Sequence, residues 1–164
     1  MVINIEGDLT SRVVESIYNS IKDSYKIGED VEIYINSNGG YINVAVAVSE
    51  VLKYLQMSGS RIIIKNTGDV MSAATIIWLN CNERIWDPNY NFLIHNPYME
   101  GISGDAEQLI EQAVELADVE EDIRELYCAI SGKTPVEVEV MMEQERPMTV
   151  DELLDWKFIT SVKK

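Results

Sequence analysis

The chain of 164 residues has 28 acidic and 13 basic side chains and a net charge of −15 at pH 7. This charge repels phosphate backbones and anionic lipids, so we expect neither a nucleic-acid nor a membrane partner. No apolar run reaches the roughly 18 residues of a membrane span and no signal peptide opens the chain, so we expect a cytoplasmic protein of one domain.

The first hundred residues alternate between the hydrophobic periods of strands and helices. In chain order we predict strands at 2–7, 31–36 and 61–68 separated by helices at 9–25 and 40–56, then a buried helix at 72–81 and strands at 83–87 and 91–96. This order predicts an α/β fold with a mostly parallel sheet. Ligands and catalytic groups gather beyond the carboxyl ends of such strands.

The last third of the sequence is helical. Residues 105–130 carry an apolar stripe of helical period, together with nine carboxylates and one arginine. Two capping boxes, Thr134 to Glu137 and Thr149 to Glu152, predict the starts of two shorter helices. Cys81 and Cys128 share no short spacing with other ligand types, so we expect free thiols and neither a disulfide nor a zinc site.

A lone hydroxyl, Ser72, lies in the stretch GDVMSAAT, where the third strand passes into a helix. It is either a helix N-cap or a nucleophile, and a nucleophile needs a base. The one histidine of the chain, His95, ends the last predicted strand at the same edge of the sheet. The Gly39-Gly40 pair before a helix is either a turn or a source of bare N–H donors for an oxyanion.

Three stretches, YINSNGGYINVAVAVSEVLKYL, TGDVMSAATIIWLN and NFLIHNP, together resemble the ClpP family of serine peptidases, the proteolytic subunit of the Clp protease. The resemblance covers nearly the whole chain, including a long handle helix at about 103–132. It implies a ClpP/crotonase-like spiral of ββα units with a protruding handle, and a single ClpP-like peptidase domain over 1–164. The implied activity is that of a serine endopeptidase that needs no metal or organic cofactor.

Carried over by position, the resemblance implies that Ser72 is the nucleophile and His95 the general base, and that the N–H groups of Gly40 and Ala73 form the oxyanion hole. The activity is then expected to rise with pH as the histidine loses its proton.

The third catalytic residue of the family is a carboxylate. The family has an aspartate where the stretch QERPMT places Glu145. A carboxylate of either type can orient a histidine, so Glu145 is the expected member of the triad. Glu143 and Asp151 are the alternatives, and each of the three could equally be a solvated surface charge.

The family's assembly gives further expectations. We expect a homo-oligomer, a heptameric ring with two rings stacked through their handles, that acts on peptides or unfolded proteins. The chain starts almost at its first strand, without the family's N-terminal gate segment, so we do not expect standard docking of an AAA+ unfoldase. This trimmed form suggests a phage-encoded or otherwise divergent homologue, which would work in the host cytoplasm.

Two alternatives stay open at the level of sequence. A catalytically degenerate ClpP-like subunit would keep the architecture without an activated serine. A crotonase-type acyl-CoA enzyme shares the ββα spiral and the paired oxyanion donors, but it would use carboxylates near the glycines and would not need His95.

Overall fold

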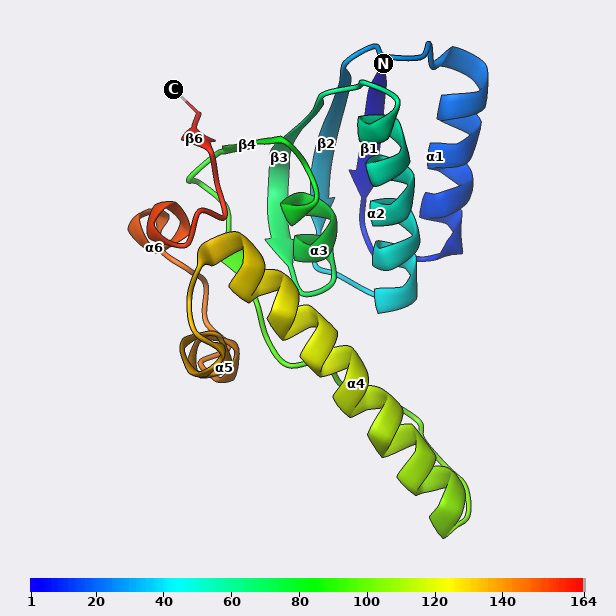
Figure 1. The fold of residues 1–164 in the computed structure, drawn as a ribbon, viewed down its shortest axis with the longest axis vertical. Helices are drawn as coiled ribbons and strands as arrows, with labels where there is room; N and C mark the ends of the chain where they lie inside the picture. The colour runs from blue at the N-terminus through cyan, green and yellow to red at the C-terminus, as the bar shows by residue number, and fades with distance from the viewer. Residues whose placement is uncertain (164) are drawn as a thin grey trace.

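The computed structural model describes residues 1–163 and contains one parallel sheet (Figure 1). Its strands follow the order β1-β2-β3-β4-β6, and β5 pairs separately with β3. Every strand pair is parallel. The strands are β1 (Val2–Glu6), β2 (Val31–Ser37), β3 (Ile62–Met71), β4 (Glu83–Trp86), β5 (Phe92–Leu93) and β6 (Ser161–Val162). The predicted α/β class with a mostly parallel sheet is confirmed.

Three helices cover the sheet and close the core. They are α1 (Ser11–Ser24), α2 (Ile42–Met57) and α3 (Ala74–Leu79). Helix α1 packs against β1 and α2, and α3 packs against α2 and β3. Strand β2 shows why this face is covered, since Val31, Ile33 and Ile35 are fully buried while the residues between them are half-buried. This alternation is the period of a strand with one face in the core.

The C-terminal helices are α4 (Ala106–Ser131), α5 (Pro135–Glu143) and α6 (Val150–Asp155). Helix α4 projects far from the sheet, which agrees with the predicted handle (Figure 1). Both predicted capping boxes are present, at Thr134 before α5 and at Thr149 before α6. Each satisfies N–H groups that the first helical turn leaves without a partner.

The strand predicted at 91–96 is much shorter than expected. Only Phe92 and Leu93 pair with the sheet, where they face Val70 and Met71. Strand β3 correspondingly continues to Met71, because β5 pairs with Val70 and Met71 beyond the residues that pair with β4. His95 therefore lies beyond the strand, in the irregular segment that leads to Pro97.

An aromatic cluster holds β5 in place. The ring of Phe92 lies 5.7 Å from Trp86, 5.7 Å from Phe158 and 6.3 Å from Trp78, measured between ring centroids. All four side chains are buried. The cluster thus fixes the chain three residues before His95.

Neither α4 nor any other helix within residues 1–163 has the length and apolar composition to cross a bilayer. Cys81 and Cys128 are free thiols, and burial raises the pKa of both.

Candidate active site

Ser72 occupies a strained turn between β3 and α3. Its φ is 54°, in the left-handed region that side chains other than glycine rarely adopt. The N-cap of α3 is Ala73, and no side chain caps this helix, so Ser72 is not a capping residue. Such strain persists only where the surrounding structure enforces it, and it concentrates at functional sites.

Backbone contacts hold the serine next to the segment that carries His95. The N–H of Ser72 donates to the carbonyl oxygen of Leu93 at 2.9 Å. The Ser72 carbonyl in turn accepts from the N–H of Thr75 at 3.0 Å and from its Oγ1 at 2.6 Å. Because His95 follows Leu93 by two residues, the ladder between β3 and β5 brings the hydroxyl and the imidazole to one rim.

The imidazole of His95 is half-buried and already oriented. Its Nδ1 lies 2.6 Å from the carbonyl oxygen of Asn96, and the ring of Tyr98 lies against it at 5.9 Å with a tilt of 31°. A carbonyl only accepts hydrogen bonds, so Nδ1 carries the proton and Nε2 is left as the acceptor. That tautomer can receive a proton from a serine.

Ser72, His95 and Gly40 line one cavity of about 960 Å³. Its wall also includes the segment from Pro97 to Ile102 and the residues around Leu9. A cavity of this size accommodates an extended peptide segment.

Gly40, which lines this cavity, has a backbone amide without a partner in the described residues. Leu9 binds both neighbours of Gly40, through its own N–H to the Gly39 carbonyl at 2.8 Å and through its carbonyl to the Tyr41 N–H at 3.0 Å. The N–H of Gly39 donates to Ser37 Oγ at 3.2 Å. Within the described chain, the N–H of Gly40 makes no protein hydrogen bond.

Ala73, the residue after Ser72, has a second backbone N–H group without a partner in the described part of the chain. Its N–H also makes no hydrogen bond within residues 1–163, and Ala73 lines a small recess together with Ser72 and His95.

Gly40 has φ 137°, and a Cβ there would lie 2.7 Å from Leu9 N and O, so only glycine fits. Backbone N–H groups without internal partners suit a developing oxyanion.

Glu145 is not part of this cluster in the structure. Its side chain is exposed and lines neither the large cavity nor the small recess. Its φ is 46°, and within the described residues only Ser72 and Lys157 share a positive φ among non-glycine residues. Glu143 and Asp151 are likewise exposed and absent from both linings.

The small recess of about 10 Å³ lies between Ser72 and the handle helix. Tyr127 of α4 forms part of its wall, and the Tyr127 hydroxyl lies 2.7 Å from Thr75 Oγ1. Since Thr75 donates its single proton to the Ser72 carbonyl, Tyr127 is the donor to Thr75. Burial raises the pKa of Tyr127 to about 12, so it stays protonated in this role.

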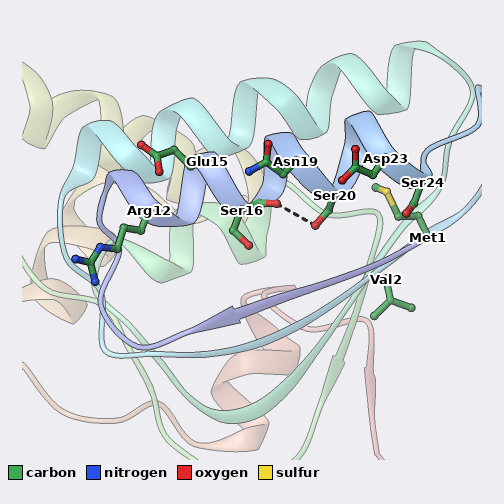
Figure 2. Close-up of a pocket in the computed structure, with 9 residues that line it drawn as sticks. All are labelled: Met1, Val2, Arg12, Glu15, Ser16, Asn19, Ser20, Asp23 and Ser24. Carbon is green, nitrogen blue, oxygen red and sulfur yellow. Dashed lines mark hydrogen bonds between the residues drawn. The ribbon is translucent and has the colours of Figure 1, made fainter.

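Another cavity, of about 640 Å³, lies between α1 and the start of β1 (Figure 2). Figure 2 shows Ser16 and Ser20 on α1, where Ser20 Oγ donates to the Ser16 carbonyl at 2.9 Å. The one histidine of the chain lies elsewhere, so these serines lack an imidazole base. The groove therefore does not compete with Ser72 as a nucleophilic site.

The sequence did not point to Asn96, Tyr98, Thr75 or Tyr127 as part of the site. Tyr98 and Asn96 are close to His95 in sequence, but no spacing rule identifies a ring stack or a carbonyl contact.

Among residues 1–163, no group of three His, Cys, Asp or Glu side chains is arranged to hold a metal ion.

Comparison with known proteins identifies the family and supports the fold. The chain is 24% identical over 136 residues to the ATP-dependent Clp protease proteolytic subunit 3 of Rhizobium johnstonii, covering 82% of this chain and 68% of the relative. It superposes on the N165D mutant of ClpP1 from Listeria monocytogenes with a TM-score of 0.81 at 20% identity, covering 99% of this chain and 91% of the other. The family model described as Clp protease matches residues 2–164, and the chain therefore belongs to the Clp protease family.

Proposed function

We propose that the protein is a serine endopeptidase in which Ser72 attacks the peptide carbonyl and His95 takes its proton. The observation that carries this proposal is the strained Ser72, held by Leu93 beside His95 at the rim of one cavity. In the first step a bond forms between Ser72 Oγ and the carbonyl carbon, and the serine proton passes to His95 Nε2. The peptide C–N bond then breaks as that proton passes to the leaving amine. In the second half of the reaction His95 takes a proton from water, the water oxygen bonds to the acyl carbon, and the ester bond breaks as the proton returns to Ser72 Oγ.

The unpaired N–H groups of Gly40 and Ala73 support an oxyanion hole. The tetrahedral intermediate places a negative charge on the former carbonyl oxygen, and two fixed amide donors stabilise this charge. Loss of one such donor costs about 10²–10³ in kcat in comparable enzymes. Neither donor needs a metal ion or an organic cofactor.

Glu145 is the proposed third member of the triad, in competition with Glu143 and Asp151. In the proposed catalytic arrangement its carboxylate replaces the Asn96 carbonyl as the acceptor of the Nδ1 proton and stabilises the imidazolium. The left-handed backbone at Glu145 is compatible with a functional role for this turn, because such conformations are enriched at functional sites. The Glu145→Gln variant should then lose most of its kcat, whereas Glu143→Gln and Asp151→Asn should keep theirs. If one of these two variants loses its kcat and Glu145→Gln keeps it, that other carboxylate is the third member of the triad.

We propose that residues 1–164 act as one peptidase domain within a homo-oligomeric ring, heptameric and stacked in pairs, that takes peptides or unfolded chains in the cytoplasm. Exposed apolar side chains on α4, Leu109, Ile110 and Val114, support a contact through the handle.

A short fluorogenic peptide assay tests the proposal. Wild type should hydrolyse the peptide, and Ser72→Ala should lose this activity while it keeps the same thermal unfolding midpoint. A fluorophosphonate probe should add its mass once to wild type and not to Ser72→Ala. A chain that neither cleaves nor labels would be the degenerate subunit, and thioester turnover that survives in Ser72→Ala would indicate a crotonase-type enzyme.

A further inference from the structure

The small recess beside Ser72 limits which substrates fit, provided that the protein is the peptidase proposed above. Its apolar walls come from three helices: Ile42 of α2, Ile76 of α3, and Ile123 and Tyr127 of α4. Ser72, Ala73, His95 and Pro97 complete its lining. The recess is thus adjacent to both the proposed nucleophile and one proposed oxyanion donor.

The proposed attack geometry indicates which substrate group would enter the recess. In the attack geometry the scissile carbonyl carbon meets Ser72 Oγ and its oxygen meets the Ala73 N–H. The side chain of the residue that supplies this carbonyl lies only one bond further away, on the adjacent Cα. It therefore lies within reach of the recess, while the rest of the peptide has room in the large cavity of about 960 Å³.

The recess is too small for a large side chain. Its volume is about 10 Å³, which is near the minimum of about 10–15 Å³ that holds one water molecule. A glycine or alanine substrate residue places at most a methyl group there. A leucine or phenylalanine would need the walls to move.

The wall at Tyr127 resists such movement. The side chain is 2% exposed, its hydroxyl donates to Thr75 Oγ1 at 2.7 Å, and its ring packs against Phe158 at 5.7 Å. Displacing the ring would leave a buried hydroxyl without a partner and disturb a close-packed core. Thr75 is also hydrogen-bonded to the Ser72 carbonyl, so movement of Tyr127 would propagate to the nucleophile.

We infer that Tyr127 closes the recess beside Ser72 and restricts the protein to substrates with a small residue, glycine or alanine, immediately before the scissile bond. Tyr127 is a specificity-determining residue in this scheme, and it takes no part in proton transfer.

The test uses peptidyl aminomethylcoumarin amides that differ only in the residue attached to the coumarin: alanine, leucine or phenylalanine. Wild type should favour alanine over leucine and over phenylalanine by at least tenfold in kcat/KM. Tyr127→Ala and, as a second way to open the same recess, Ile123→Ala should reduce or reverse this preference. Tyr127→Phe keeps the ring and should keep the wild-type ranking.

Leu126→Ala is the matched control, because Leu126 is the neighbour of Tyr127 on α4 and does not line the recess. Labelling of Ser72 by a fluorophosphonate and the thermal unfolding midpoint show which variants are folded and reactive. Wild type that labels and cleaves the leucine substrate as fast as the alanine substrate would overturn the inference and leave the peptidase proposal intact. Absence of both labelling and cleavage would overturn both.

Discussion

Gly39 lies directly against Ser72. A Cβ placed on Gly39 would be 2.6 Å from the Ser72 Cβ and 3.1 Å from its Oγ, and 3.0 Å from the Met71 carbonyl oxygen. Cβ atoms do not approach another carbon this closely, so the two turns fit together only because Gly39 has no side chain. The glycine turn and the serine turn are thus one packed unit, although they are 33 positions apart in the sequence.

The Gly39→Ala substitution should therefore displace Ser72 and lower kcat/KM by about 100-fold, since a misplacement of about 1 Å has that effect on catalysis. The control is Gly7→Ala, because Gly7 also has a positive φ but a Cβ there meets nothing within 4 Å. Gly7→Ala carries the backbone penalty of about 1–2 kcal/mol without the collision and should keep its activity. Equal loss in the two variants would show that backbone strain, and not contact with Ser72, is responsible.

The Arg146–Glu152 pair fixes the turn that carries Glu145. Arg146 donates to both carboxylate oxygens of Glu152 and to the Pro147 carbonyl at 3.0 Å. The hydrogen bonds from Arg146, with smaller contributions from Thr149, lower the pKa of Glu152 to about 2. The folded state is therefore stabilised by the charged carboxylate above the ordinary value of 4.5, and this stabilisation is lost as the pH falls from 4.5 towards 2.

Replacement of Glu152 by glutamine should lower the free energy of unfolding at pH 7 by about 1 kcal/mol, a value that allows for solvent screening of a partly exposed pair. Glutamine can still cap α6, so the variant isolates the charge. Urea unfolding of both proteins from pH 7 down to pH 3 should show the difference shrinking below pH 4.5. A difference that stays constant over this range would contradict the assignment.

The aromatic cluster around Phe92 should carry a large part of the stability. Phe92 is fully buried, and its truncation to alanine leaves a cavity among Trp78, Trp86 and Phe158. We expect a loss of about 3–5 kcal/mol in the free energy of unfolding. Leucine at this position should cost clearly less, and a loss below 1 kcal/mol for alanine would mean that the cluster does not anchor β5.

The acidic handle predicts an assembly that depends on salt. Glu111, Glu115 and Asp118 flank the exposed apolar residues Ile110 and Val114 on α4. If handles of two rings meet, these like charges repel, and the screening length falls from about 30 Å at ~0.01 M salt to about 8 Å at ~0.15 M. Sedimentation velocity should show the double ring becoming more abundant as salt or mild acid is added.

The triple variant Glu111→Gln, Glu115→Gln, Asp118→Asn should assemble equally well at both salt concentrations. Profiles of wild type that do not change with ionic strength would remove the electrostatic argument.

Local signals explain which features were predictable from sequence. The capping boxes at Thr134 and Thr149 need only contacts within four residues, and both helices begin where these motifs place them. Strand β6 was not predicted, because two residues that pair with Ile85 and Trp86 leave no periodic pattern. The strand at 91–96 was predicted too long for the related reason that its partner, and not its composition, determines where pairing stops.

The candidate site shows the same contrast between features that a local pattern predicts and features that depend on distant residues. Ser72, His95 and the glycine pair are candidates from sequence because each follows a strand of a parallel sheet, and the topology brings such positions together. The hydrogen bond between Thr75 and Tyr127 joins residues 52 positions apart and depends on how α4 packs on α3. No pattern in a single sequence reports such a contact.

The central claim is that His95 activates Ser72, and covalent labelling tests it most directly. Intact mass spectrometry after exposure to a fluorophosphonate should show one adduct on wild type, none on Ser72→Ala, and labelling at least 100-fold slower on His95→Ala. All three proteins should unfold at similar temperatures. Labelling of His95→Ala at the wild-type rate, or an adduct on Ser72→Ala, would contradict the account.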